Sequence, residues 1–152
     1  SEARVTVASG AALDLGGSSQ TIAGLSGGGM VSNGTLTVTG TVAPGGTNVI
    51  GTLTLAASTA LTGTLLMDVA ADGSCDLLNV QGALDLTALT LRIQDAGLLK
   101  TRMQYLIATC TPGGLKGPFE ATDLDGNRWS VSYNNAKGEV RLVSRGLLVF
   151  VR

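Results

Sequence analysis

The sequence contains no histidine, and this absence excludes several kinds of active site at once. The Ser-His-Asp and Cys-His arrangements need an imidazole as general base, and most zinc sites need one as a ligand. The two cysteines, Cys75 and Cys110, lie far apart and form no Cys-x-x-Cys redox or metal motif. The sequence therefore predicts a protein that is not an enzyme and that binds neither a cofactor nor a metal ion.

Charged residues, aromatic residues and prolines are also scarce. Charged residues make up 14% of the 152 residues, aromatic residues 3%, and there are three prolines. So little proline excludes collagen and proline-rich linkers. No stretch approaches the roughly 20 apolar residues that a membrane-spanning helix needs. What remains is 44% hydrophobic with 22 glycines, which is too apolar and too nearly neutral for a disordered chain.

Charge and aromatic residues are unevenly distributed along the chain. Residues 1–90 contain one base, Arg4, and six acids, whereas residues 91–152 contain nine bases and five acids. The bases of the second part are scattered rather than clustered, which argues against a nucleic-acid partner. All the aromatic residues also lie in the second part: Tyr105, Phe119, Trp129, Tyr133 and Phe150. The chain therefore changes character near residues 90–100.

Short runs of alternating apolar and small polar residues recur along the first part, separated by Gly, Ser or Asn. Examples are Gly34–Thr39, Gly51–Leu55 and Gly63–Val69. This period of two predicts strands with one buried face. The pattern Gly-x-Leu-x-Leu/Val is a loose internal repeat, and each run is too short to bury its apolar face alone. Stacked coils would bury a continuous column of Leu and Val, so the repeat indicates an all-β solenoid.

The second part has the features of a cap on such a stack. Residues 127–133 and 139–143 predict an antiparallel hairpin around a turn at 134–138. Leu147–Val151 predicts one more apolar strand, and Asp95–Met103 one or two helical turns with Asp95 as N-cap. We predict a single domain, 1–152, with stacked coils over 1–93 and a cap over 94–152. The cap would cover strand edges that otherwise invite aggregation, with a core of Tyr105, Phe119, Trp129, Tyr133 and Phe150.

Three motifs in a fixed order carry a family resemblance. They are Asn33–Gly46 followed by Ile50–Leu55, then Gly73–Leu86, and finally Tyr105–Ala108 followed by Gly114–Phe119. In this order they resemble the C-terminal passenger region of bacterial autotransporters, including the autotransporter-associated β-strand repeat. Each motif alone is simple, because Gly, Leu and Thr are easily matched; their order is the more specific feature.

The resemblance implies a right-handed parallel β-helix with a C-terminal antiparallel hairpin cap, sometimes called an autochaperone region. It implies a non-enzymatic stalk module of a secreted or surface-displayed protein, located outside the cell or at the bacterial outer membrane surface. Its partner would be the preceding β-helical part of the same polypeptide. Cys75 falls where the family motif often has an aromatic core residue, which favours burial.

The two cysteines leave two interpretations open. In an extracellular protein Cys75 and Cys110 could form a disulfide, which would contribute roughly 3–4 kcal/mol for a loop of this length. Alternatively, they are two buried thiols that pack as small hydrophobic side chains.

Two other functions compete with the structural one. An adhesin would recognise host glycan or protein, and Trp129 and Tyr133, which alternate on one strand face, could form a small platform, although core packing is the expectation. A carbohydrate-active β-helix enzyme, or a calcium site, would use carboxylates. The candidates are Asp68, Asp72, Asp76 and Asp85, for which we expect a turn at Asp72–Gly73 and exposure to water of the others.

Two further motifs have simpler explanations. Asp123–Asn127 resembles the start of a calcium loop, but Asn134 stands where the loop needs a glutamate, so a hairpin turn is expected. The glycine-rich segment Pro112–Gly117 contains a lysine but lacks the spacing of a phosphate-binding loop.

Overall fold

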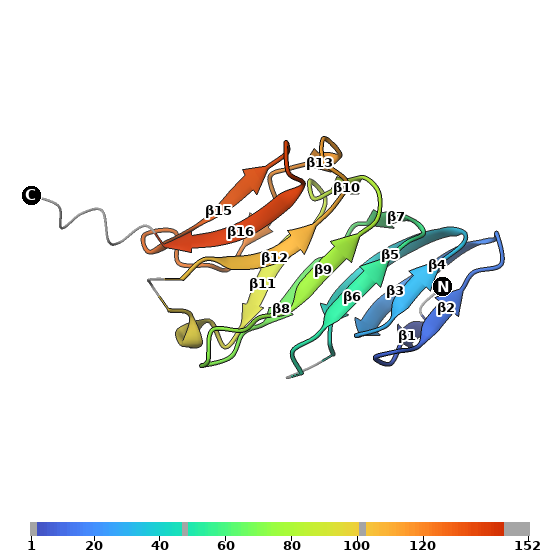
Figure 1. The fold of residues 1–152 in the computed structure, drawn as a ribbon, viewed down its shortest axis with the longest axis horizontal. Helices are drawn as coiled ribbons and strands as arrows, with labels where there is room; N and C mark the ends of the chain where they lie inside the picture. The colour runs from blue at the N-terminus through green and yellow to red at the C-terminus, as the bar shows by residue number, and fades with distance from the viewer. Residues whose placement is uncertain (1–2, 47–48, 101–102, 145–152) are drawn as a thin grey trace, which may run out of the picture.

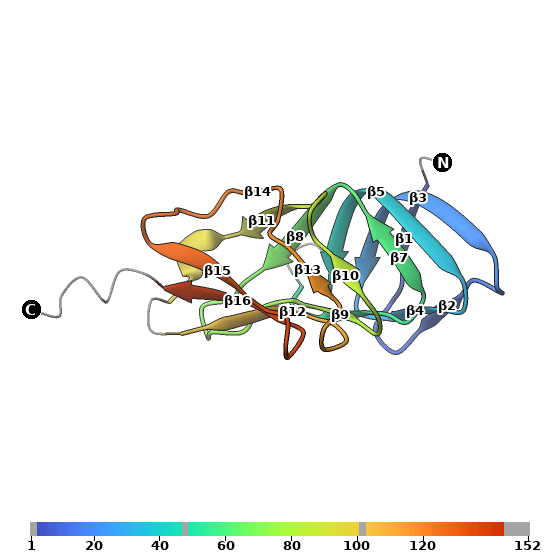
Figure 2. The same cartoon turned by 90° about the horizontal axis from the view of Figure 1, so that it is seen from above.

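The protein is all-β. The computed structural model describes residues 3–46, 49–100 and 103–144. Most strands belong to two sheets that face each other along the long axis of the molecule (Figures 1 and 2). The first sheet contains β1 (Arg4–Thr6), β3 (Ser19–Gly27), β5 (Thr35–Pro44), β7 (Ser58–Leu61), β8 (Thr64–Asp68), β11 (Thr90–Gln94) and β14 (Ala121–Thr122). The second contains β2 (Ala12–Asp14), β4 (Met30–Ser32), β6 (Thr52–Leu55), β9 (Leu77–Val80), β12 (Tyr105–Thr109), β15 (Trp129–Asn134) and β16 (Glu139–Ser144).

The order of the strands within each sheet follows the order of the chain. The first sheet runs β1-β3-β5-β8-β11-β14, and the second runs β2-β4-β6-β9-β12 before it reaches β16 and β15. Strand pairs are parallel from β1 through β14, including the short pair β10 (Leu84–Asp85) and β13 (Leu115–Lys116). The chain therefore passes back and forth between the sheets and adds each new strand beside the previous one in the same direction.

Equivalent side chains lie in rows across the sheets, and these rows make the core. In the second sheet Leu53 pairs with Leu78, and Leu78 pairs with Ala108. In the first sheet Val42 pairs with Leu65, and Leu65 with Leu91. All six side chains are fully buried (Leu53, Leu78, Ala108, Val42, Leu65 and Leu91). The alternation seen in the sequence is thus the alternation between this core and the outer faces.

Close stacking explains two of the repeated glycines. A Cβ on Gly63 would collide with the carbonyl oxygen of Gly40, and a Cβ on Gly40 would collide with that of Ala23. Gly40 lies within β5 where its register with β3 shifts, and Gly63 comes directly before β8; at both points the backbones of successive strands approach each other too closely for any side chain.

The predicted C-terminal hairpin is confirmed. β15 pairs with β16 in antiparallel register from Trp129 opposite Ser144 to Asn134 opposite Glu139. β16 also pairs with β12 in antiparallel register, so the hairpin extends the second sheet with reversed direction. Parallel pairing continues past residue 93, through β12 and β14, so the change in direction comes at Trp129. The predicted strand Leu147–Val151, with Phe150, lies outside the described residues.

Two local predictions meet different outcomes. Ala96–Leu98 forms a single 3-10 turn, closed by a hydrogen bond from Leu98 N to Asp95 O, within the segment expected to be helical. Asp123–Asn127 is a turn, as expected, but not a hairpin turn, because β14 before it pairs with β11 while β15 after it pairs with β16. The turn instead carries the chain from one sheet to the other.

Candidate functional site

Four of the five aromatic residues meet in two pairs at the end of the molecule that carries β15 and β16. The rings of Tyr105 and Trp129 lie 6.0 Å apart at 64°, an edge-to-face contact, and those of Phe119 and Tyr133 lie 6.1 Å apart at 54°. Tyr105, Phe119 and Trp129 are buried and Tyr133 is half-buried. Such pairs add roughly 0.5–1.5 kcal/mol each beyond area burial.

Both tyrosine hydroxyls also accept backbone hydrogen bonds. Tyr105 Oη accepts from Lys100 N at 2.8 Å, and Tyr133 Oη accepts from Phe119 N at 3.0 Å. Burial is the main reason that the pKa of Tyr133 is raised. A hollow of about 290 Å³ lies beside these rings, lined by Phe119, Leu124 and Trp129 among others. The aromatic side chains therefore fasten separate segments to each other, as expected for core packing.

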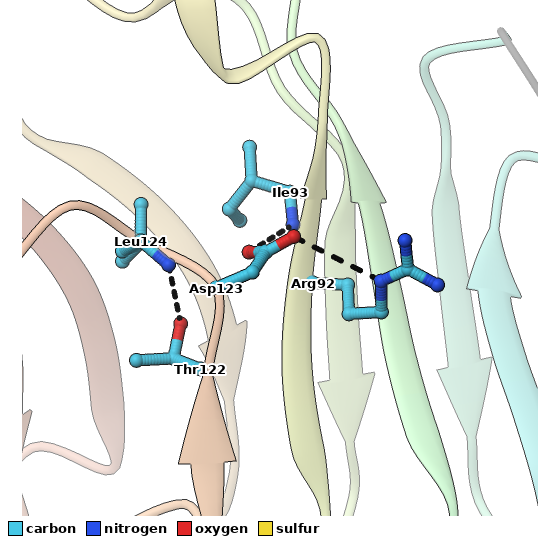
Figure 3. A network of polar contacts seen from close by, with 5 residues as sticks. All are labelled: Arg92, Ile93, Thr122, Asp123 and Leu124. Atoms are coloured by element: carbon cyan, nitrogen blue, oxygen red, sulfur yellow. Dashed lines mark hydrogen bonds and ion pairs between the residues drawn. The ribbon is translucent and has the colours of Figure 1, made fainter.

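The turn after β14 is fastened to the first sheet by Asp123. Its Oδ1 accepts a hydrogen bond from Ile93 N at 3.1 Å, and its Oδ2 lies 3.8 Å from Arg92 Nε, both on β11 (Figure 3). Beside it, Leu124 N donates to Thr122 Oγ1 at 3.2 Å (Figure 3). Asp123 thus continues the pairing of β14 with β11 by side-chain contacts.

Cys75 and Cys110 are free thiols, so the disulfide alternative is not formed. Cys75 Sγ donates to Leu106 O and Cys110 Sγ donates to Thr111 O, each at 3.5 Å. Burial, followed by the negative charge of Asp76, raises the pKa of Cys75 to about 11. Burial likewise raises the pKa of Cys110. The two thiols pack separately and stay protonated at neutral pH.

The four aspartates proposed for chemistry are not gathered in one place. Asp72 is exposed and accepts hydrogen bonds from Ser74 N and Ser74 Oγ, in the predicted turn with Gly73 at φ 95°. Asp85 is exposed on β10, 4.0 Å from Lys116 Nζ on β13. Over residues 3–46, 49–100 and 103–144, no three His, Cys, Asp or Glu side chains come together as a metal site would require. Hydrogen bonds from Ser74 lower the pKa of Asp72, and hydrogen bonds from Thr87 lower the pKa of Asp85.

Asp68 and Asp76 differ from the other two, and the expectation that they face water is wrong. Asp76 is 0% exposed and Asp68 is 4% exposed. Asp76 Oδ1 accepts a hydrogen bond from Gly51 N at 2.9 Å, and its Oδ2 accepts one from Asp68 N at 2.8 Å. Asp68 Oδ2 accepts one from Val49 N at 3.2 Å. Two buried carboxylates thus hold the backbone that leads into β6.

Burial dominates the ionisation of Asp76. It raises the pKa of this carboxyl to about 7, the nearby charge of Asp68 adds to the rise, and the hydrogen bonds from Asp68 N and Gly51 N oppose it. A carboxyl with this pKa holds its proton at mildly acidic pH and loses it near neutral pH. The sequence did contain a signal for its burial. Asp76 lies two and four positions before Leu78 and Val80, and alternate positions along a strand face the same side, here the core.

The opposite end of the molecule is open. Among the described residues, no strand pairs with the outer edges of β1 and β2, which end the two sheets there (Figure 1). Val5 and Leu13, which continue the inward rows, are only half-buried. They line a hollow of about 370 Å³ with Ile22 and Leu36. This end therefore exposes apolar core together with backbone hydrogen-bonding groups.

The chain matches no protein-family model, and the searches of curated proteins and of solved structures likewise find no match. Within the described part of the chain, no helix is long and apolar enough to span a membrane.

Proposed function

We propose that this chain is a structural module: the C-terminal end of a right-handed parallel β-helix, closed by its own hairpin. The module would belong to the stalk of a secreted or surface-displayed bacterial protein, as in autotransporter passengers. Its role would be to stabilise the stack, which is a structural role rather than an enzymatic one.

The strand order supports a β-helix. One passage through the first sheet and then the second is one circuit of the chain, and each circuit pairs in parallel with the one before it. Short parallel strands that alternate between two sheets are what successive circuits of a solenoid produce. Parallel crossover connections within a sheet are right-handed in nearly all proteins, which favours the right-handed form.

The difference between the two ends carries the proposal for a capping role. At the β1/β2 end, Val5 and Leu13 are half-buried beside the 370 Å³ hollow. At the other end, the antiparallel hairpin β15–β16 follows β12, and the Tyr105–Trp129 pair packs beneath it. The antiparallel hairpin interrupts the parallel addition of circuits in the second sheet, and we propose on this ground that the stack is extended at the β1/β2 end.

The partner that fits the open end is more chain of the same kind. Its free strand edges offer backbone groups to a parallel strand, and its half-buried Val5 and Leu13 offer an apolar surface to a further row. We propose that the preceding β-helical part of the polypeptide occupies this position. The four aspartates are not gathered in one place, which lends no support to the alternative of a carbohydrate-active enzyme. The aromatic rings beside the hollow at Trp129 pack against other side chains, so this hollow does not favour an adhesin.

The test is to add one circuit at each end in turn. Thr41 and Arg4 both pair with Gly24, so a copy of residues 24–40 joined directly to Arg4 reproduces one complete circuit in register. The matched control carries the same copy after Arg152. We expect the first fusion to raise both the urea midpoint and the m-value, because more surface is buried in one cooperative unit. The control should leave both unchanged. Equal behaviour of the two fusions would contradict the proposal.

A further inference from the structure

The turn that follows β4 holds an exposed asparagine directly before a glycine. Asn33 is the only asparagine in the sequence with a glycine after it, and it is exposed. Asparagine is among the chemically labile residues of proteins. It is most labile before glycine, because a residue without a side chain does not hinder attack by its own amide nitrogen on the asparagine side chain. Asn33 is therefore the asparagine whose neighbour favours deamidation most.

Deamidation proceeds in two steps and needs only water. The Gly34 nitrogen attacks Asn33 Cγ, the bond from Cγ to Nδ2 breaks, and ammonia leaves with the proton of the Gly34 amide. Water then opens the resulting succinimide ring at either of its carbonyl carbons. The product is aspartate, or isoaspartate, in which the main chain runs through the former side chain and is longer.

Backbone contacts between the first two circuits hold the segment around Asn33 in place. Asn33 has a φ of 60°, in the left-handed region, where the next amide nitrogen points away from the side chain. Gly17 N donates to Asn33 O at 2.7 Å, and a Cβ on Gly34 would lie 2.5 Å from Ser18 O. Ring closure must turn the planar peptide between Asn33 and Gly34, which moves Asn33 O away from Gly17 N. The reaction therefore requires these contacts to open.

The side chain of Asn33 is held by Asp14 of the preceding circuit. Asn33 Nδ2 donates to Asp14 Oδ1 at 2.9 Å, and the same oxygen accepts from Gly16 N at 2.8 Å. The hydrogen bond from Gly16 N, followed by the one from Asn33, lowers the pKa of Asp14, so this carboxyl is ionised at neutral pH. Its negative charge disfavours the anionic intermediate that forms at Asn33 Cγ. Asp14 therefore slows the reaction by holding the amide and by its charge.

We propose that Asn33 is a site of spontaneous deamidation, which stays slow while the first two circuits are stacked, and that its product loosens this stacking. The aspartate product lacks the donor for Asp14 and places a second carboxylate beside it. The isoaspartate product lengthens the main chain at Gly34, where the preceding circuit leaves no room even for a Cβ. Either product separates the turns that follow β2 and β4. This chemistry does not depend on the proposed capping role.

Peptide mapping by mass spectrometry, after incubation of the full chain at neutral pH with and without urea, follows the reaction. We expect Asn33 to deamidate at least about tenfold more slowly in the folded chain than in the unfolded chain, because the turn must open first. Equal rates in the two states would overturn the restraint by the fold, and this comparison needs no variant.

Two variants test the part played by Asp14. Asp14→Ala should raise the rate at Asn33 in the folded chain roughly threefold, as an exposed contact of this kind allows. The matched control is Asp85→Ala, which removes an exposed aspartate that accepts from Thr87 N in another turn and should leave the rate unchanged. In urea both variants should match the unaltered chain. The same rise in both variants, or no rise in Asp14→Ala, would overturn the restraint by Asp14.

Asn33→Asp reproduces the aspartate product and tests its effect on the stacking. The Gly17 amide donates to the carbonyl oxygen of residue 33, so its hydrogen exchange reports the contact between the two circuits. We expect the protection factor of Gly17 to fall roughly threefold at neutral pH, whereas that of Thr54, which donates to Gly29 O, should change little. The deamidated fraction of the unaltered chain, separated by ion exchange, should show the same pattern. No change at Gly17, or an equal fall at both amides, would overturn the loosening.

Discussion

Replacement of Leu78 by alanine tests whether the rows of equivalent side chains stabilise the protein. Leu78 is 0% exposed, and its neighbours in the row, Leu53 and Ala108, are also fully buried. The substitution removes three buried carbons, which at about 0.8 kcal/mol each amounts to about 2.4 kcal/mol. Strand neighbours on both sides prevent collapse into the space, so a cavity term adds to this cost. We expect a total loss of about 3–4 kcal/mol in the free energy of unfolding.

The matched control is Leu77→Ala, one position earlier on β9. Leu77 faces the other side of the sheet and is only half-buried, so its loss should cost about 1 kcal/mol. Urea unfolding of the full chain, followed by circular dichroism, measures both variants, and an unchanged m-value shows that the two-state comparison is valid. Equal costs for Leu77→Ala and Leu78→Ala would refute the assignment of the inner and outer faces.

Three further predictions concern the C-terminal hairpin, the closely packed glycines and the charges. Trp129→Ala, which removes the buried partner of Tyr105, should cost about 3–4 kcal/mol by urea unfolding, against under about 0.5 kcal/mol for the exposed Ser132→Ala on the same strand. Gly63→Ala should cost roughly 2–3 kcal/mol because its Cβ meets the Gly40 carbonyl, whereas Gly82→Ala, with open space around the new Cβ, should change the urea midpoint little. Thermal unfolding against pH should show greatest stability near pH 4. The pKa of Asp76 is raised in the folded protein, so the stability that this carboxyl gives is fully present below pH 3.8 and is lost as the pH rises toward about 7. The pKa values of Asp14, Asp72 and Asp85 are lowered in the folded protein, so the stability that these carboxylates give is lost as the pH falls below 3.8. A stability that rose steadily from pH 4 to pH 7 would contradict this assignment.

The strands themselves were accessible from the sequence because their signal is local. Alternation along Gly51–Leu55 and Gly63–Val69 predicts β6 and β8, and it also predicts which side chains face inward. The hairpin of β15 and β16 was accessible for the same reason, because both strands and their turn lie within one short segment. A period of two is a property of neighbouring residues, and it needs no knowledge of the partner strand.

Features that depend on contacts between circuits were not accessible in the same way. The pairing of β12 with β9 and of β14 with β11 continues the parallel sheets into the aromatic part, and composition alone placed the change of character earlier. The burial of Asp68 depends on a backbone segment of the preceding circuit, and Asp68 breaks the alternation set by Leu65 and Met67. For Asp76 the parity was readable, but a charged side chain is so rarely buried that exposure was the expectation.

The stacking of the chain on itself is tested most directly by methyl–methyl nuclear Overhauser effects in the intact protein. Val42, Leu65 and Leu91 lie on neighbouring parallel strands, which are about 4.8 Å apart in a sheet. We predict cross-peaks from Val42 to Leu65 and from Leu65 to Leu91, together with a contact between Tyr105 and Leu142 where the hairpin joins. Cross-peaks that instead paired these segments in antiparallel register, as in a closed sandwich, would contradict the stacked arrangement.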